Sequence, residues 1–315
     1  MTSSNSIKIL AVIPLRLASS RVPRKILADI GGKSLSARTL GQVQTALGDN
    51  PHVKILAAVD DIATVKHLKE IDPSLEVILT SPGIPSGTDR VFAATQDWLA
   101  RTPEARKNLR GILNIQGDMP FAGVDGLRQA AGFYESATDE DLRRYSMITL
   151  AQSWPKDQPL ESRGAVKVLT DRAGGALYFS RHPIPYSMNV PDKKQWNSVE
   201  FLPVCQLHIG LYGYTLEALS RLASHAPIDM ERGESLEQLR ALWLGIQILV
   251  LSTEPGEGEN FRGLDTPEDL RWARNFAKPR KAAKNKTQKK PAAKKKSASK
   301  KPAKKTPAKK KVRRS

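Results

Sequence analysis

The 315-residue chain has one cysteine, few aromatic residues and no long apolar segment. A single cysteine, Cys205, excludes an internal disulfide framework and a cysteine-based zinc site, and it suits a reducing compartment. No apolar run approaches the roughly 18 residues that a membrane-spanning helix requires. The apolar run at 7–13 contains Lys8 and is followed at once by Pro14, so it is a poor secretory signal. We therefore expect a cytoplasmic protein without a transmembrane segment.

Acidic residues are absent from the C-terminal segment 277–315, which holds 19 of the 50 lysine and arginine residues. The rest of the chain has 31 basic and 32 acidic residues, so the net charge of +18 arises in this segment alone. Its Lys-, Ala- and Pro-rich composition cannot form a core, which predicts a disordered basic tail. Such a tail binds polyanions, either nucleic acid or anionic lipid, without sequence specificity. The alternative is a solvated extension with no dedicated role.

The body, residues 1–276, alternates short apolar runs with helical patterns. The apolar runs are typical of buried parallel strands, which we expect at 7–13, 53–59, 76–79 and 111–115. Helical patterns separate them, including those at 34–47 and 86–99. This order predicts an α/β fold with a doubly wound, mostly parallel sheet that has helices on both faces.

The pattern changes between about residues 145 and 214, where strand-like runs are separated by turn-rich stretches. We interpret this region as an inserted α+β subdomain within the single domain 1–276. After it, the pattern predicts a helix at 234–244, a strand at 247–251 and a helix at 266–276. Thr266 followed by Pro267 is a typical helix start.

The loop after the first strand concentrates cations within ten residues, namely Arg16, Arg21, Arg24 and Lys25. Ligands of open parallel sheets bind outside the carboxyl ends of the strands, and a polyphosphate requires several such donors. Ser19 and Ser20 add hydroxyl and backbone donors. The loop has neither a Walker A nor a Gly-x-Gly-x-x-Gly pattern. It predicts a polyphosphate site, with a solvated basic loop as the alternative.

The loop motif Pro-x-Arg-x-Ala-Ser-x-Arg-x-Pro-x-Lys at 14–25 resembles the nucleotide loop of the cytidylyltransferases that activate sugar acids. Further motifs follow in order: Ser-Gly-Thr-Asp-Arg at 86–90, Asn-Ile-Gln-Gly-Asp-Met-Pro at 114–120, Ala-Val-Lys-Val at 165–168, Ala-Leu-Tyr-Phe-Ser-Arg at 176–181, Pro-Ile-Pro at 183–185, His-Ile-Gly-Leu-Tyr-Gly-Tyr at 208–214, Leu-Glu-Gln-Leu-Arg at 236–240 and Leu-Asp-Thr-Pro-Glu-Asp-Leu at 264–270. From about residue 7 to 276, the chain is similar to the 3-deoxy-manno-octulosonate (Kdo) cytidylyltransferases, and this resemblance implies a sheet of the nucleotide-diphospho-sugar transferase kind.

This resemblance implies an enzyme that joins CTP to Kdo, an eight-carbon sugar acid, and makes CMP-Kdo for lipopolysaccharide biosynthesis. The anomeric hydroxyl would attack the α-phosphorus and pyrophosphate would leave. The resemblance also implies Mg²⁺, held by Asp118 and Asp265, and a homodimer whose interface the region 145–214 helps to form. Without the resemblance, Asp265 would be as good a helix N-cap as a metal ligand.

The resemblance assigns the nucleotide side to residues near the carboxyl ends of the first strands. Those expected to bind CTP are Arg16, Ser19, Ser20, Arg21, Lys25, Ser86, Gln116 and Asp118. Among them, Arg16, Lys25 and Asp118, together with Asp265, are expected to be catalytic. Ser86 opens a helix, where backbone donors suit an anionic ligand, although an ordinary capped helix start would have the same sequence.

The resemblance assigns the sugar acid to Arg181, His208, Glu234 and Gln238. Arg181 is suited to pair bidentately with the substrate carboxylate. His208 lies on an apolar strand, where a core histidine is the alternative. Glu234 and Gln238 are four residues apart and would share one face of the predicted helix. Glu237 could serve equally well.

Three departures from the family pattern concern the sugar acid: Met119, Leu207 and Gly164. Two of them remove a charge near the expected sugar site, so a related acid such as an 8-amino analogue is an alternative to Kdo. A second alternative is a polyanion-binding protein whose body is an inactive nucleotide fold. The retention of Arg16, Lys25, Asp118 and Asp265 argues against that alternative.

Overall fold

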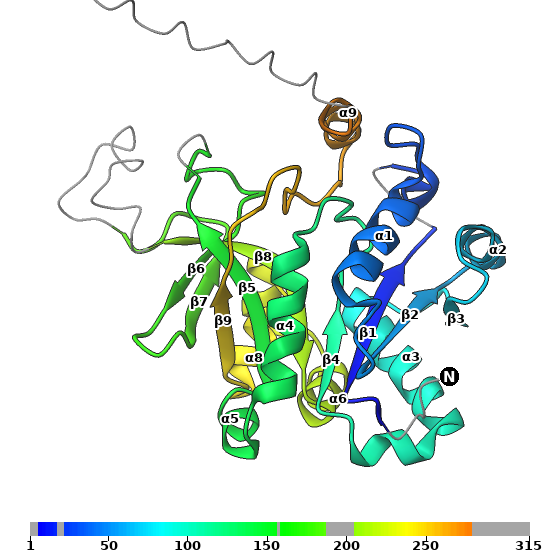
Figure 1. Ribbon diagram of the computed structural model, residues 1–315. Coiled ribbons are helices and arrows are strands. Elements are labelled where there is room, and N and C mark those ends of the chain that lie inside the picture. The colour runs from blue at the N-terminus through cyan, green and yellow to red at the C-terminus, as the bar shows by residue number, and fades with distance from the viewer. Residues whose placement is uncertain (1–5, 18–21, 156–157, 187–204, 279–315) are drawn as a thin grey trace, which may run out of the picture. The chain divides into compact units, whose positions relative to one another are not determined.

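The computed structural model describes residues 6–17, 22–155, 158–186 and 205–278. Residues 1–278 form one compact unit, in which a nine-stranded sheet is covered by helices on both faces (Figure 1). The main path of the sheet has the strand order β3-β2-β1-β4-β8-β5-β9. The predicted α/β class is confirmed.

The first half of the sheet is parallel, as predicted. Its strands are β1 (Ile9–Leu15), β2 (Val53–Val59), β3 (Glu76–Leu79) and β4 (Gly111–Asn114). The helices between them are α1 (Leu35–Leu47), α2 (Ile62–Ile71) and α3 (Gly87–Arg101), and the 3-10 turns are η2 (Lys25–Leu27) and η3 (Pro103–Lys107). All seven residues of β1 are buried, because both faces of the strand are covered.

Side chains of β1 alternate between two hydrophobic cores. Leu10 and Val12 face the core that contains residues of α3, whereas Ile9, Ala11 and Ile13 face the core that contains residues of α1 and of α4 (Val124–Ser136). The two cores therefore lie on opposite faces of the sheet, as the alternation of strand side chains requires. Burial ends at the carboxyl end of β1, where the next residue, Arg16, is exposed.

The second half of the sheet mixes directions. It comprises β5 (Met147–Ser153), β8 (Gln206–Tyr214) and β9 (Ile248–Ser252), with β8 antiparallel to both β4 and β5. In the described part of the chain, β6 (Lys167–Thr170) and β7 (Ala176–Ser180) lie off the main path, as a hairpin beside β8. The predicted insert at about 145–214 is thus continuous with the central sheet, because its two longest strands, β5 and β8, pair within that sheet.

The remaining helices are α5 (Asp139–Arg144), α6 (Leu216–Ala223), α7 (Asp229–Glu234), α8 (Gln238–Trp243) and α9 (Pro267–Phe276). The single helix predicted at 234–244 is wrong. Glu234 ends α7, Ser235 adopts a left-handed conformation (φ 51°) and Gln238 begins α8. Glu234 and Gln238 consequently do not share a helix face.

The final helix begins as predicted. The Thr266 side chain accepts a hydrogen bond from the Asp269 backbone, and the Asp269 carboxylate accepts one from the Thr266 backbone, forming a capping box. Residues 279–315 lie outside the described residues, so the predicted disorder of the tail stays a prediction. In the described part of the chain, no helix is long and apolar enough to cross a membrane.

Candidate active site

Three residues predicted to be catalytic meet at one point. The Lys25 Nζ atom lies 2.8 Å from Asp118 Oδ2 and 3.1 Å from Asp265 Oδ1. Lys25 begins η2, Asp118 follows β4 and Asp265 directly precedes the cap of α9. Residues separated by up to 240 positions in sequence are therefore joined by one ammonium group.

Local backbone contacts bring the two carboxylates together. Gly117 passes so close to β1 that a Cβ atom there would lie 2.6 Å from the Pro14 carbonyl oxygen, which excludes larger residues. The Leu264 backbone N–H donates to the Asp118 carbonyl at 3.0 Å, linking the two turns. Thr266 is the cap of α9, so the expectation that Asp265 could be the cap is wrong, and its carboxylate is directed to Lys25 instead.

The electrostatics of the cluster favour a charged lysine. Burial lowers the pKa of Lys25, but the charges and hydrogen bonds of Asp118 and Asp265 outweigh burial and raise this pKa above its usual value. The lysine is therefore an ammonium ion at neutral pH. It compensates the charge of two carboxylates that would otherwise repel one another.

Other residues assigned to CTP surround the same strand ends. Arg16 donates to the carbonyls of Ile84 (3.0 Å) and Pro85 (3.1 Å), just before α3. Ser86 caps α3 by accepting from the Asp89 backbone at 3.0 Å. Gln116 also lies near this turn: a Cβ atom built on Gly87 would be 4.0 Å from Gln116 Oε1. Ser19, Ser20 and Arg21 lie outside the described residues.

A buried ion pair behind the loop was missed by the sequence reasoning. Asp60, at the carboxyl end of β2, accepts from the Leu17 backbone at 2.9 Å and lies 3.5 Å from the Arg90 guanidinium. Arg90 is fully buried; burial lowers its pKa and the Asp60 charge opposes that shift. The signal in the sequence was an aspartate at the end of a predicted strand. Asp118 has a similar position, just after the end of a predicted strand.

Among the residues predicted to bind the sugar acid, which we call the sugar side, Glu234 and Arg181 contact one another. The Glu234 carboxylate accepts from the Ser180 hydroxyl (2.6 Å) and from the Arg181 backbone (2.8 Å). The Arg181 guanidinium donates to the backbone carbonyls of Glu234, Ser235 and Arg163. These bonds use three of its five N–H groups.

His208 and Gln238 occupy more buried positions. His208 is half-buried, hydrogen-bonds to the Thr149 hydroxyl at 3.0 Å and packs edge-on against Phe179. Burial lowers the pKa of His208 to about 3, so the ring is neutral at neutral pH. Gln238 is only 3% exposed, and within the described residues its Nε2 has no hydrogen-bond partner.

Lys167 is a second buried lysine, to which the sequence assigned no role. Its Nζ atom donates to the carbonyls of Ser162 (2.8 Å), Ala165 (2.7 Å) and Arg181 (3.0 Å). Burial lowers the pKa of Lys167 to about 8. A lysine within an apolar strand motif was the signal in the sequence. The bond to the Arg181 carbonyl fixes the backbone of a residue that we predict to bind the sugar acid.

Two of the three departures from the family pattern, Met119 and Leu207, have structural explanations, and nothing in the structure explains Gly164. Met119 is buried in the core that contains β1 residues, and Leu207 packs against the small core that contains Trp154 and Cys205. A Cβ atom on Gly164 would meet open space. Met119 and Leu207 thus supply packing where the family pattern has charges.

Known proteins with similar sequences define the class of this fold and site. A family model described as cytidylyltransferase matches residues 10–248. The 3-deoxy-manno-octulosonate cytidylyltransferase of Polynucleobacter asymbioticus is 34% identical over 267 residues, which cover 85% of this chain and 94% of that protein. The protein of the same name from Cytophaga hutchinsonii is 34% identical over 270 residues, which cover 85% and 96%.

A solved structure agrees with these sequence matches. It is that of a CMP:2-keto-3-deoxy-manno-octonic acid synthetase complexed with CTP, with 26% identity, a TM-score of 0.68 and coverage of 85% of this chain and 98% of that one. The chain belongs to the 3-deoxy-manno-octulosonate cytidylyltransferase family.

Proposed function

We infer that the protein transfers CMP from CTP to the anomeric hydroxyl of Kdo, giving CMP-Kdo and pyrophosphate for lipopolysaccharide biosynthesis. The observation that carries this inference is the convergence of Lys25, Asp118 and Asp265 at the carboxyl ends of parallel strands, in a chain of this family. Transfer to phosphorus depends mainly on positioning and on neutralising negative charge. A cluster of one cation and two carboxylates is suited to both tasks.

The residues of the nucleotide side have distinct parts in this reaction. Lys25 and Arg16 neutralise the triphosphate, and the start of α3 after Ser86 presents backbone donors to it. Gln116 holds the nucleotide from the adjacent strand end. As the anomeric oxygen bonds to the α-phosphorus, the bond from phosphorus to the bridging oxygen breaks, and its electron pair leaves with pyrophosphate.

Mg²⁺ is the metal that fits the donor set. Asp118 and Asp265 already surround one cation, the Lys25 ammonium, at 2.8 and 3.1 Å. Among the described residues no group of three or more His, Cys, Asp or Glu side chains is arranged around a metal site. Mg²⁺ is often held by one or two carboxylates, with phosphate oxygens and waters completing its shell. Bound there, it would neutralise charge on the triphosphate.

On the sugar side, Arg181, His208, Glu234 and Gln238 are the residues that we propose to bind the acid. The neutral His208 ring can accept or donate a hydrogen bond to a hydroxyl. The buried Gln238 amide retains a donor, as described above. The remaining N–H groups of Arg181 are suited to a carboxylate. These assignments leave a related sugar acid, such as an 8-amino analogue, as the second candidate substrate, because Met119 and Leu207 replace charges.

One assay tests the function. The purified protein is incubated with CTP and magnesium and with Kdo, 8-amino-Kdo or another sugar acid, and pyrophosphate release is measured. We expect release with Kdo at the highest kcat/KM. Release only with a different acid would refute the substrate and retain the reaction. No release with any acid would refute the enzyme activity and favour a polyanion-binding protein with an inactive nucleotide fold.

We also propose a homodimer, a cytoplasmic location and polyanion binding by the basic segment 277–315. The homodimer is supported by the family resemblance. Polyanion binding is supported by the 19 basic residues and the absence of acidic ones in the segment.

A further inference from the structure

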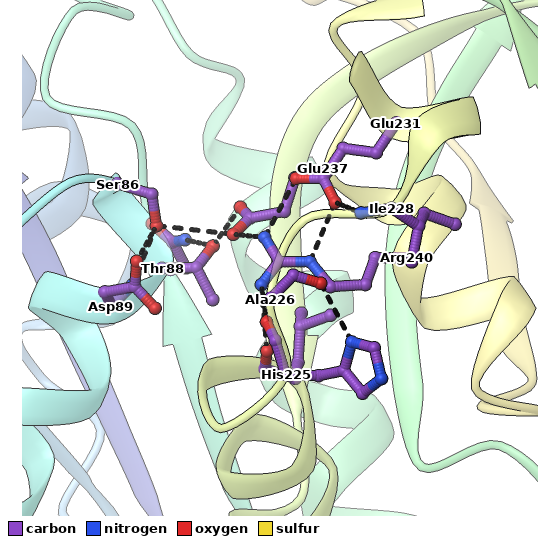
Figure 2. Close-up of polar contacts among 11 residues, drawn as sticks. Ser86, Thr88, Asp89, His225, Ala226, Ile228, Glu231, Glu237 and Arg240 are labelled. Carbon is purple, nitrogen blue, oxygen red and sulfur yellow. Dashed lines mark hydrogen bonds and ion pairs between the residues drawn. The ribbon is translucent and has the colours of Figure 1, made fainter. Parts of the chain in front are cut away.

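A buried threonine lies between the two substrate sides. Thr88, the second residue of α3, is 2% exposed, and its hydroxyl donates to Glu237 Oε2 at 2.6 Å. The Thr88 hydroxyl oxygen also accepts a hydrogen bond from Asn114 Nδ2 at 3.4 Å. Figure 2 shows Ser86, Thr88 and Glu237 directed toward one another from two separate segments of the chain. The hydroxyl thus joins α3 to the start of α8.

The chain of hydrogen bonds continues from Thr88 to the nucleotide side. Asn114, the last residue of β4, is fully buried, and its Oδ1 atom accepts from Gln116 Nε2 at 3.4 Å. Gln116 is a candidate nucleotide-binding residue two positions before Asp118. A shift of Thr88 would therefore reach Gln116 through a single intervening side chain.

The chain also continues from Glu237 to the sugar side. Glu237 Oε1 accepts from Arg240 at 3.1 Å, and Arg240 binds both carboxylate oxygens of Glu231 at 2.9 Å (Figure 2). Glu231 belongs to α7, whose last residue, Glu234, holds Arg181. Glu237 itself directly precedes Gln238. Burial raises the pKa of Glu237, whereas its bonds to Thr88 and Arg240 oppose that shift.

The relative placement of the two sides matters for the reaction. The anomeric oxygen and the α-phosphorus must approach to roughly 3–3.5 Å with aligned orbitals, and a misplacement of about 1 Å can cost about 10²-fold in rate. Fully satisfied buried polar networks hold their members in one arrangement. The network through Thr88 is therefore suited to set the distance between nucleotide and sugar acid.

We propose that Thr88 is a positioning residue, whose buried hydroxyl holds the nucleotide-side turn at 84–88 and helix α8 in register. The proposal rests on the proposed function, because it concerns the same two substrates. Replacing the hydroxyl by a methyl group leaves Glu237 Oε2 and Asn114 Nδ2 with one partner fewer at a buried place. Both substrate sides then lose the same anchor.

The experiment compares wild type with Thr88→Val, which keeps the shape, and Thr88→Ser, which keeps the hydroxyl. Because the turn at 84–88 and α8 each carry residues of one substrate side, we expect Thr88→Val to raise the KM for CTP and the KM for Kdo about tenfold each, and the misplacement of the reacting atoms to lower kcat as well. Thr88→Ser should return both values to within about threefold of wild type. The matched control is Thr138→Val, which removes a threonine–carboxylate hydrogen bond of the same length, 2.6 Å, at the start of α5; it should change neither KM.

Three results would overturn the proposal: unchanged KM values in Thr88→Val, a rise in only one of them, or equal defects in Thr88→Ser and Thr88→Val. The double variant Thr88→Val, Glu237→Gln should be no worse than the more defective single variant, because both changes break the same link. If the KM increases of the two single variants multiplied in the double variant, the shared link between Thr88 and Glu237 would be refuted. The melting temperature of each variant shows whether a defect arises from loss of the folded state. An inactive wild type would refute the function instead, so the two failures are distinguishable.

Discussion

The nucleotide side and the sugar side each contain a buried lysine, and the two lysines have opposite surroundings. Lys25 contacts the carboxylates of Asp118 and Asp265, which raise its pKa. Lys167 contacts three backbone carbonyls, and burial lowers its pKa to about 8. The first lysine belongs to a cluster of ions, whereas the second holds a turn in place.

This difference indicates how each side works. Carboxylates that hold an ammonium ion are also suited to a metal ion, which is the role that we propose for Asp118 and Asp265. Backbone carbonyls cannot leave their positions without moving the chain, so Lys167 is a permanent brace of the segment that carries Arg181. Substitutions at the two sites can test this contrast between Lys25, held by carboxylates, and Lys167, held by backbone carbonyls.

The largest effect is expected from Asp118→Asn on the nucleotide side. The change removes one of two carboxylates that we propose as metal ligands, and we expect kcat/KM to fall by about 10³-fold, equivalent to about 4 kcal/mol. Pyrophosphate release measures it, and the melting temperature monitors folding. Asp125→Asn, at an exposed aspartate in the first turn of α4, is the control and should be as active as wild type. Activity of Asp118→Asn within tenfold of wild type would remove Asp118 from the proposed ligands.

The nucleotide side was the more predictable region. Apolar runs in the sequence predicted the parallel strands β1 to β4, and the carboxyl ends of parallel strands meet at one edge of the sheet. That rule brings residues after β1 and β4 together, and it indicated the cations of the loop that ends at Lys25, whereas the role of Asp118 came from the family resemblance. Asp265 required the family resemblance, because its local sequence was equally compatible with a helix cap.

The sugar side was less predictable because tertiary contacts decide its geometry. The sequence pattern at 234–244 favoured one helix. Ser235 instead adopts a left-handed conformation, which no sequence rule indicated. Lys167 was quoted only as part of a motif, since its three carbonyl partners come from a turn and from the residue after β7. Thr88 and Asp60 were missed because the partners of a buried polar side chain are known only from the structure.

A smaller effect, on stability, is expected at Lys167. Its pKa is about 8 in the folded protein and near its ordinary value of 10.5 when unfolded. Between these values the unfolded chain binds a proton that the folded chain lacks, so raising the pH disfavours unfolding. From pH 7 to 9.5, the free energy of unfolding of wild type should rise relative to Lys167→Met by about 2 kcal/mol. Urea unfolding at several pH values measures the difference.

Lys25→Met is the matched control for that measurement. The pKa of Lys25 is raised above 10.5 in the folded protein, so both states keep the proton up to pH 9.5. The difference between wild type and Lys25→Met should therefore stay constant over this range. If the two lysine variants showed the same pH dependence, the contrast between their surroundings would be refuted.

The smallest effect is expected from Ser235→Gly, at the break between α7 and α8. Ser235 has φ 51° and ψ 49°, a left-handed conformation that glycine adopts without steric cost. We expect the change to raise the free energy of unfolding by about 0.5–1 kcal/mol, measured by urea unfolding. Ser235→Ala, which removes the hydroxyl but keeps the Cβ atom, should bring no such gain. A loss of stability in Ser235→Gly would mean that the serine side chain contributes more than its backbone strain costs. Glycine keeps the left-handed backbone at position 235, so Glu234 and Gln238 on either side should keep their positions. The KM for Kdo should therefore be unchanged, which separates backbone strain from substrate binding.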